Sequence, residues 1–352
     1  MKNQDQNLDG NKQNNFFKFN TKNDKMGIFG NEIGGFKSQD SKKHQNKLKQ
    51  NIEIKSIYPD KIKEQILKEA AEAGLLPKEN KDNNDIKNSL RKNEQEKDEK
   101  YIESAKKRLE ELEKIVGFGK HGMMGYRPDD KREFTYNNLF YSVALSSLGD
   151  TQKAKEVLEN ILKHIPFGDR GMIGFSPDDK DEYTDNNLFY SIALSSLGDT
   201  QKAKEVLENT LKHVPFGSHG MIGYREYTSN NLLYSIALFK TGKTQKANQI
   251  IKNTLKNVPL GEHGMIGDRP GDKDEYTNNN LLYSIALSNT GDVQKAEQVI
   301  KNILKNVPFG HHGMIGRRPD SENEDTDDSL LLIIAEALIG KAGETAKIAN
   351  PF

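Results

Sequence analysis

The feature that most constrains this chain is a sequence unit that occurs several times in tandem. A glycine followed by methionine marks each copy, at positions 122, 171, 220, 264 and 313, in steps of 49, 49, 44 and 49 residues. The short step comes from one deletion, because residues 223–228 read GYREYT where residues 125–135 read GYRPDDKREFT. Self-similarity at such a period is the signature of a repeat fold, in which each unit packs against its neighbours.

Each unit contains two stretches in which apolar residues recur at helical spacing. In the first full unit, a helix is predicted from near Asn137 and Asn138 to Leu148, with Thr135 as its cap and Gly149 as a stop. A second helix is predicted over residues 151–165, and Pro166 ends it. Each pair has an apolar stripe that it cannot bury alone, so the pairs must stack.

The array is incomplete at both ends. Residues 101–116 carry the pattern of a second helix without a first, and residues 329–340 carry the pattern of a first helix with too little chain left for its partner. The sequence therefore predicts an all-α fold of tandem helical hairpins, with a period of about 49 residues. The hairpins form either an open α-solenoid or a closed or nearly closed α/α toroid, in which the two incomplete ends would pair.

The chain before the array has a different composition. Residues 1–57 are rich in Asn, Lys and Gln, and we expect a disordered tail. Residues 58–75 show one amphipathic helical pattern and predict an isolated helix. Residues 76–100 are almost wholly polar and predict a charged linker or a polar single helix. The helical repeat domain then occupies residues 101–352.

The charge balance and the absence of cysteine restrict the partners. Lys+Arg and Asp+Glu number 52 each, so no basic excess favours nucleic acid or an anionic membrane surface. There is no cysteine, which fits a reducing compartment. The longest apolar run, within residues 330–339, is interrupted by Glu336 and is too short for a membrane span. We expect a cytoplasmic protein without a cofactor, a nucleic-acid partner or a membrane partner.

A turn, a small residue, an apolar residue and a proline recur at fixed offsets in the helical part of each unit. In the first full unit they are Gly149, Asp150, Ala154, Leu158 and Pro166. This pattern resembles the tetratricopeptide repeat, although Asn138 and Ser142 replace that family's Trp and Gly, and about 15 extra residues separate the hairpins. The resemblance implies an open helical scaffold that binds a protein or peptide.

The long loops before each first helix support a second resemblance. Helical hairpins with short loops on one face and long loops rich in Tyr, Asp and Asn on the other look like α/α toroids, a fold used by many glycan-processing enzymes. This resemblance implies a ring whose long loops build a site for a carbohydrate.

The recurring histidines are weak candidates for a metal site. They are His121, His219, His263 and His312, with Arg170 at the same place in the second unit. Loops one repeat apart are separated by about 10 Å of stacked helices, too far for shared ligation of one ion. The Arg170 substitution also favours a role as a hydrogen-bond donor, so we expect no metal.

Two asparagines recur at the start of each first helix, at 137–138, 186–187, 230–231 and 279–280. Asn is a mediocre helix residue, so its amide there can either brace the loop or face a ligand. Positions that differ between copies are the best pointers to specificity. After the last loop glycine these are Tyr126, Phe175, Tyr224, Asp268 and Arg317; after the threonine they are Tyr136, Asp185, Ser229, Asn278 and Asp327.

Because the units are close copies, they favour a repeated binding surface over an asymmetric catalytic set. We therefore expect a non-catalytic scaffold that binds a protein or peptide; the alternative is a glycan-active enzyme or carbohydrate-binding protein on an α/α toroid. No catalytic residue and no metal ligand are assigned. The candidate binding residues are Tyr126, Asn138, Asp185, Asn187, Tyr224, Asn231, Asp268, Asn280 and Arg317.

Overall fold

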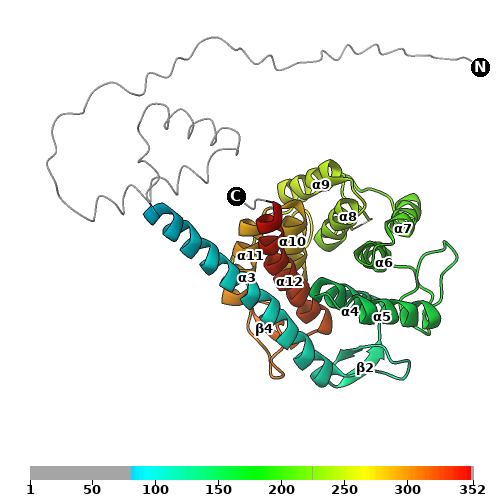
Figure 1. The fold of residues 1–352 in the computed structure, drawn as a ribbon. Coiled ribbons are helices and arrows are strands. Elements are labelled where there is room, and N and C mark those ends of the chain that lie inside the picture. The colour runs from blue at the N-terminus through cyan, green and yellow to red at the C-terminus, as the bar shows by residue number, and fades with distance from the viewer. Residues whose placement is uncertain (1–80, 224, 350–352) are drawn as a thin grey trace, which may run out of the picture. The chain divides into compact units, whose positions relative to one another are not determined.

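Helices dominate the part of the chain that the computed structural model describes, residues 81–223 and 225–349 (Figure 1). The expected tail 1–57 and the isolated helix 58–75 lie outside these residues. In chain order the helices are α3 Lys81–Val116, α4 Thr135–Leu148, α5 Thr151–His164, α6 Thr184–Ser196, α7 Thr200–His213, α8 Thr228–Lys240, α9 Thr244–Asn257, α10 Thr277–Thr290, α11 Val293–Asn306 and α12 Thr326–Ala349.

The first helices of the units form a closed inner ring. Helix α4 packs against α6, α6 against α8, α8 against α10, α10 against α12, and α12 returns to α4. Figure 1 shows these five helices around a common centre. Their middle turns are buried on all sides, as in α4, where Asn137 to Leu145 are all buried. The ring leaves no open concave surface along the inner helices.

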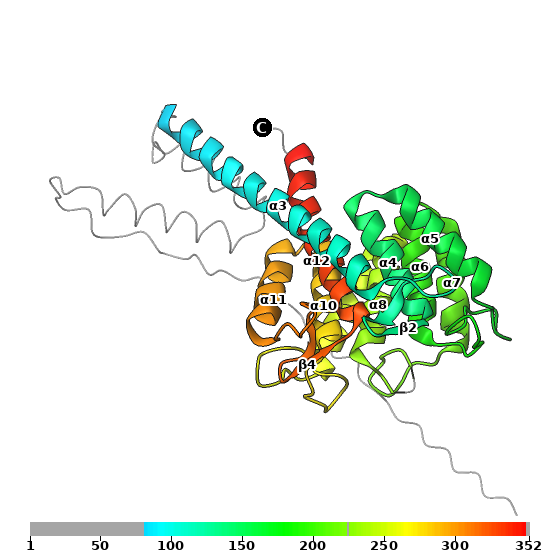
Figure 2. The same cartoon turned by 90° about the horizontal axis from the view of Figure 1, so that it is seen from below.

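The second helices form an outer layer, one behind each inner helix. Helices α5, α7, α9 and α11 pack on the inner helix that precedes them in the chain, and α3 packs on α12 (Figures 1 and 2). The contact is close at Gly340, where an added Cβ would lie 2.8 Å from the backbone oxygen of Asp98. The two incomplete ends of the array thus form one hairpin, which confirms the closed α/α toroid. The tetratricopeptide-like open scaffold is wrong, because its ends would lie apart.

Helix α3 begins earlier than the repeat pattern. It is continuous from Lys81, so residues 81–100 are a polar helix rather than a flexible linker. On α3, Ser104 Oγ donates a hydrogen bond to the buried carboxylate of Glu336 in α12, and Arg108 forms an ion pair with it, with Nε 3.2 Å from Glu336 Oε2. Polar groups as well as apolar ones therefore hold the closing hairpin.

Local signals explain where the helices begin and end. The side chains of Asp150, Asp199 and Asp292 accept hydrogen bonds from backbone N–H groups in the first turns of α5, α7 and α11. Gly149 and Gly291 end α4 and α10 in the left-handed conformation that favours glycine. Short turns of this kind keep each hairpin antiparallel.

An apolar layer fills the middle of the ring. It consists of the residue five positions after the threonine that begins each inner helix: Phe140, Phe189, Leu233, Leu282 and Leu331, each at most 5% exposed. The rings of Phe140 and Phe189 lie 3.8 Å apart between centroids. The ring therefore has a solid core and is not a pore.

The long loops all lie at one end of the ring, before the inner helices. Two of them contain short antiparallel hairpins, β1 Gly125–Arg127 with β2 Asp130–Glu133, and β3 Gly316–Arg318 with β4 Ser321–Glu324. The threonine that begins an inner helix holds the next loop: Thr135 Oγ1 donates to Gly174 O at 2.7 Å, and Thr326 Oγ1 donates to Tyr126 O at 2.6 Å. The second of these bonds joins the last unit to the first.

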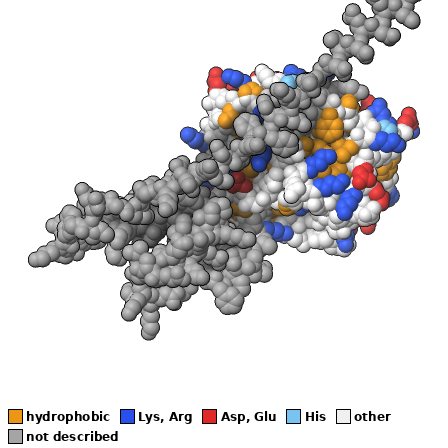
Figure 3. Space-filling view, turned by 90° about the horizontal axis from the view of Figure 1, so that it is seen from above, with side chains coloured by type: hydrophobic (Ala, Val, Ile, Leu, Met, Phe, Trp, Pro, Cys, Tyr) orange, Lys and Arg blue, Asp and Glu red, His pale blue; other side chains and the backbone are white. Residues whose placement is uncertain are grey.

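Figure 3 shows one face, on which basic and acidic side chains are mixed with small hydrophobic patches. No helix among residues 81–223 and 225–349 is long and apolar enough to cross a membrane.

Candidate active site at the mouth of the ring

The first turns of the five inner helices meet at the end of the ring that carries the long loops. The residue after each threonine lies there and is half-buried. These residues are Tyr136, Asp185, Ser229, Asn278 and Asp327. Since they differ between units, the mouth is asymmetric although the fold repeats.

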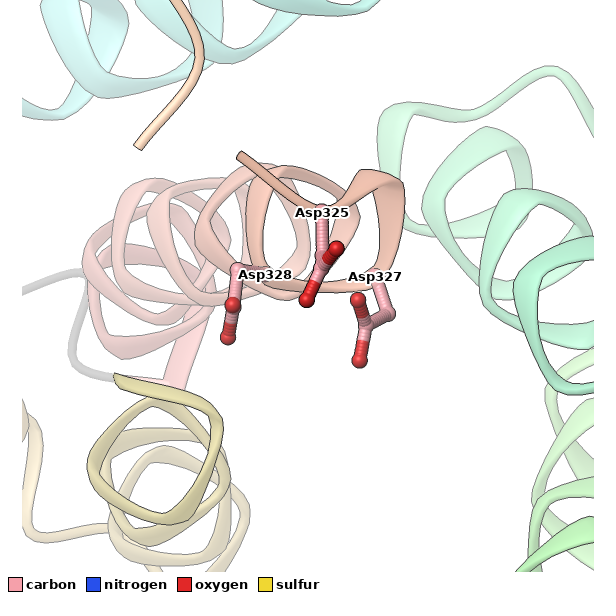
Figure 4. A group of neighbouring side chains, drawn as sticks. All are labelled: Asp325, Asp327 and Asp328. Carbon is pink, nitrogen blue, oxygen red and sulfur yellow. The ribbon is translucent and has the colours of Figure 1, made fainter. Parts of the chain in front are cut away.

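Three carboxyl groups gather at the start of α12. Asp325 immediately precedes the helix, and Asp327 and Asp328 lie in its first turn. Oxygen atoms of the three carboxyls lie within 4.8 Å of one another. Figure 4 shows that the three side chains point to the same side of α12. Like charges this close resist ionisation together.

Two arginines balance part of this charge. Arg127, from β1, places Nε and Nη2 each 2.6 Å from Asp325 Oδ1. Arg317, from β3, has its Nε 4.0 Å from Asp325 Oδ2. Both hairpins therefore supply a cation to the same buried carboxylate, which is 4% exposed.

Among residues 81–223 and 225–349, no direct ion pair of this kind is formed by Asp327 or Asp328, and the charge of Arg317 only partly offsets the rise of their pKa values. Burial, together with a smaller effect of the charge of Asp325, raises the pKa of Asp327 to about 7. Burial, followed by the charges of Asp327 and Asp325, raises the pKa of Asp328 well above its usual value. Oδ1 of Asp327 is buried without a hydrogen-bond partner among the described residues, while the side chain as a whole is partly exposed. Asp327 can therefore carry a proton near neutral pH and still reach a ligand.

Further polar atoms around the mouth lack partners within the described residues. They are the side-chain oxygens Oδ1 of Asn137, Asn186 and Asp328, which occupy the same place in three units. Buried oxygens are normally hydrogen-bonded, so three unpaired acceptors in equivalent positions suit a ligand with several donors. A ligand that carries several hydroxyl groups has such donors.

One side of the mouth is lined by aromatic rings. Phe134 stacks on Tyr136 with centroids 5.8 Å apart and an interplanar angle of 7°. Tyr126 and Phe175 also contact Phe134, at 5.2 and 4.9 Å. We call Tyr126, Phe134, Tyr136 and Phe175 the aromatic wall. Burial is the largest cause of the raised pKa values of Tyr126 and Tyr136. The second cause is the charge of Asp325 for Tyr126 and the charge of Asp327 for Tyr136. The wall therefore borders the acids.

The second asparagine of each pair braces a loop. In the first unit, Asn138 Oδ1 accepts from Met124 N at 2.7 Å, and its Nδ2 donates to Phe134 O at 3.0 Å. Asn187, Asn231 and Asn280 make the same contacts in their units. Ligand contact by these four residues stays a prediction, and their protein partners leave each amide little capacity for it.

The structure places the other candidate residues differently. Tyr126 and Arg317 lie beside Asp325, and Asp185 lies at the mouth with its pKa raised by burial. Asp268 is half-buried and accepts from Asn279 Nδ2 at 3.3 Å; burial also raises its pKa. Tyr224 lies outside the described residues.

Of the three aspartates, the sequence pointed only to Asp327, as one of the positions that vary between units, and Asp325 and Asp328 were not predicted. Counted from the threonine that begins each inner helix, Asp325 stands where the other units have an aromatic residue, and Asp328 stands where they have asparagine. An acid at both positions of a single unit was the available signal. It was missed because close similarity between the copies favoured a repeated surface.

The recurring histidines have a structural role in their loops. His263 Nδ1 lies 2.6 Å from Glu275 Oε2, and the same glutamate accepts from the backbone N–H groups of His263 and Met265. The three other His–Glu pairs, and Arg170 with Glu182, repeat this arrangement. Among the described residues, the group close enough to share a cation is the three aspartates, where Arg127 already supplies positive charge.

No protein-family model and no curated protein matches the chain. Solved structures resemble it at low identity. A family 76 glycoside hydrolase, an α-mannanase of Bacteroides thetaiotaomicron, aligns with a TM-score of 0.46 and 12% identity over 71% of this chain and 97% of that one. The family 76 α-1,6-mannanase of a Salegentibacter species gives 0.48 and 12%, over 69% and 99%.

An inactive variant of the Salegentibacter enzyme, with two consecutive aspartates replaced and α-1,6-mannotriose bound, aligns with a TM-score of 0.47 and 13% identity, over 69% of this chain and 99% of that one. These values describe a distant likeness, so we base the function on the geometry of this chain. The expectation of a protein-binding scaffold of tetratricopeptide type is wrong. The inner-helix faces that such a scaffold offers to a peptide are buried in the closed ring.

Proposed function

We propose that this chain is a glycoside hydrolase whose site is the mouth of the ring. The observation that carries the proposal is the pair Asp327 and Asp325. One is a partly exposed acid whose pKa is raised to about 7, and the other is a carboxylate that Arg127 balances. Two carboxyls whose surroundings differ in this way are the groups that hydrolysis of a glycosidic bond needs.

Each carboxyl has a defined task in this proposal. Asp327 gives its proton to the glycosidic oxygen as the bond to the anomeric carbon breaks. Arg127 binds Asp325 through Oδ1, so Oδ2 is the oxygen that forms the new bond to that carbon. Water then gives a proton to Asp327 and displaces Asp325, which returns both carboxyls to their first state. Oxygen atoms of the two carboxyls lie within 4.8 Å of each other, closer than the separation of about 6.5–9.5 Å in inverting enzymes, so we assign the retaining reaction.

The aromatic wall and the unpaired oxygens support a carbohydrate ligand. Aromatic faces pack against the C–H faces of sugar rings, and the free Oδ1 atoms of Asn137 and Asn186 can accept hydrogen bonds from hydroxyl groups. Tyr and Phe provide the stacking surface here, since the chain has no tryptophan.

The test is a hydrolysis screen against a panel of glycans, with release of reducing ends as the readout. Oligosaccharides of α-1,6-linked mannose, the ligand class named for the Salegentibacter enzyme, belong among the first substrates. We expect Asp327→Asn to abolish turnover and Glu111→Gln, an exposed residue of α3, to leave it unchanged. Failure of every glycan to be cleaved or bound would sink the proposal. Binding without cleavage would instead identify a carbohydrate-binding protein, the second candidate.

A further inference from the structure

A hollow lies between the first and second long loops, beside the mouth of the ring. Its volume is about 540 Å³, within the range of about 300–1,000 Å³ common for small-molecule sites. Residues of both loops line it, among them Lys120, Arg132, Phe134, Ser176 and Asp178. Apart from Phe134, which belongs to the aromatic wall, none of these residues has a role in the hydrolysis proposed above.

The hollow is continuous with the site through one residue. Phe134 lines the hollow and also belongs to the aromatic wall, where it stacks on Tyr136. Tyr126 of the same wall lies 5.2 Å from Phe134 between ring centroids and accepts a hydrogen bond from Arg127 Nη2 at 2.9 Å, and Arg127 binds Asp325 beside Asp327. A ligand at Asp327 that extends outward along the wall therefore reaches the hollow after passing Phe134.

The lining of the hollow suits a neutral, hydroxylated ligand. Charged side chains of both signs line the hollow: Lys120 and Arg132 are basic, and Asp129 and Asp178 are acidic. The Arg132 guanidinium lies 5.5 Å from the Phe134 ring centroid and is paired with Asp130 at 2.9 Å. Mixed polar groups beside an aromatic face are the features that recognise a sugar ring, whereas an anion or a cation would meet repulsion from half of them.

We propose that this hollow is a further sugar subsite, so that the substrate is an oligosaccharide chain extending from Asp327 over Phe134 to the groove between the first and second loops. This inference rests on the proposed function of the mouth. The subsite explains why the protein would prefer longer oligosaccharides, which the carboxyl groups alone do not determine.

The experiment measures kcat/KM for oligosaccharides of increasing length from the class that the full-length protein cleaves. In the wild type we expect kcat/KM to rise with each added sugar until the hollow is filled. Ser176→Trp, which fills the hollow, should lower the ratio of kcat/KM for the longest and shortest substrates at least tenfold. Phe134→Leu, which removes the ring but keeps an apolar side chain, should lower the same ratio.

Matched controls separate this location from the rest of the rim. Arg269 occupies in the fourth unit the place that Ser176 occupies in the second, and Tyr227 corresponds to Phe134 in the third. We expect Arg269→Trp and Tyr227→Leu to leave the ratio within twofold of the wild-type value. An equal loss at all lengths, an unchanged ratio in Ser176→Trp, or an equal effect of the controls would overturn the subsite.

A binding measurement distinguishes failure of the subsite from failure of the hydrolase proposal. Isothermal titration calorimetry of the Asp327→Asn protein with the same oligosaccharides reports Kd without turnover. Affinity that rises with length and falls in the additional Ser176→Trp variant supports the subsite even if no glycan is cleaved. Affinity that is independent of length, or no binding at any length, refutes it.

Discussion

Arg127 and Asp325 are 198 residues apart in the chain, yet Arg127 Nε lies 2.6 Å from Asp325 Oδ1. The pair joins the loop of the first unit to the start of the last inner helix. It therefore closes the ring at the same place where it balances the charge of the acid cluster. Stability and chemistry depend on one contact at this seam.

Removing Arg127 should destabilise the ring. Arg127→Ala leaves the carboxylate of Asp325 buried without its main partner, which we expect to lower the free energy of unfolding by about 2 kcal/mol. Urea denaturation of the full chain at pH 7, followed by circular dichroism, measures this change. Arg132→Ala, which breaks an ion pair on the exposed part of the same hairpin, should leave the free energy of unfolding nearly unchanged. Equal losses of unfolding free energy in the two variants would show that the Arg127–Asp325 contact has no special role in closing the ring.

The raised pKa of Asp327 predicts a pH dependence of stability. Between the unfolded pKa of 3.8 and the folded pKa of about 7, the unfolded state releases a proton that the folded state keeps. The free energy of unfolding therefore falls as pH rises through this window, and the effect of Asp327 is constant above pH 7. The Asp327→Asn variant has no carboxyl group at this position, so its free energy of unfolding does not fall for this reason.

We accordingly expect Asp327→Asn to be more stable than the wild type at pH 7.5, by roughly 1–3 kcal/mol. The gain should shrink on acidification and be absent near pH 3.5. Denaturation at several pH values gives the two curves. A gain that is constant across pH would mean that the substitution acts through packing rather than through the proton.

The closing hairpin should depend on the buried pair Arg108 and Glu336. Arg108→Ala leaves Glu336, 3% exposed, with only Ser104 as a bonding partner, and we expect a loss of about 2 kcal/mol. Hydrogen exchange should accelerate first in α3 and α12. Lys107→Ala removes an exposed pair with Glu111 on the same helix and should cost no more than about 0.5 kcal/mol. Unchanged exchange in α12 would contradict this assignment.

The loop histidines provide a spectroscopic test. Glu275 is the main cause of the raised pKa of His263 through its hydrogen bond, so Glu275→Gln should lower that pKa toward 6.5. Stability from the pair is complete below pH 6.5 and is lost as pH rises through the folded pKa. NMR titration of the imidazole measures the shift. Glu262→Gln removes a minor charge effect on the same ring and should move the pKa less.

Much of the fold was readable from the sequence, because helix patterns and stop signals are local. Gly149 and Pro166 mark the ends of the helices near the observed positions. The pairing of residues 101–116 with 329–340 was expected for one of two topologies, and only the structure decided between them. Whether stacked hairpins curve into a ring depends on small rotations between neighbours, which single positions do not encode.

The site was harder to predict for a physical reason. The pKa of Asp327 depends on burial and on Asp325, and Asp325 is held by Arg127 from a distant unit. Asn138 and its equivalents looked similar to Asn137, yet the chain folds so that the former brace loops and Asn137 keeps a free oxygen. Side-chain surroundings of this kind follow from ring closure.

The closed order of threonine bonds also limits how such a chain can evolve. In an open array a unit can be gained or lost at an end with little effect on the others. Here Thr326 of the last unit binds the carbonyl of Tyr126 in the first, so an extra unit would have to change the turn between all neighbours at once. Duplication of a whole unit is therefore a disfavoured route to new specificity, and substitution or length change within the individual loops is the accessible one.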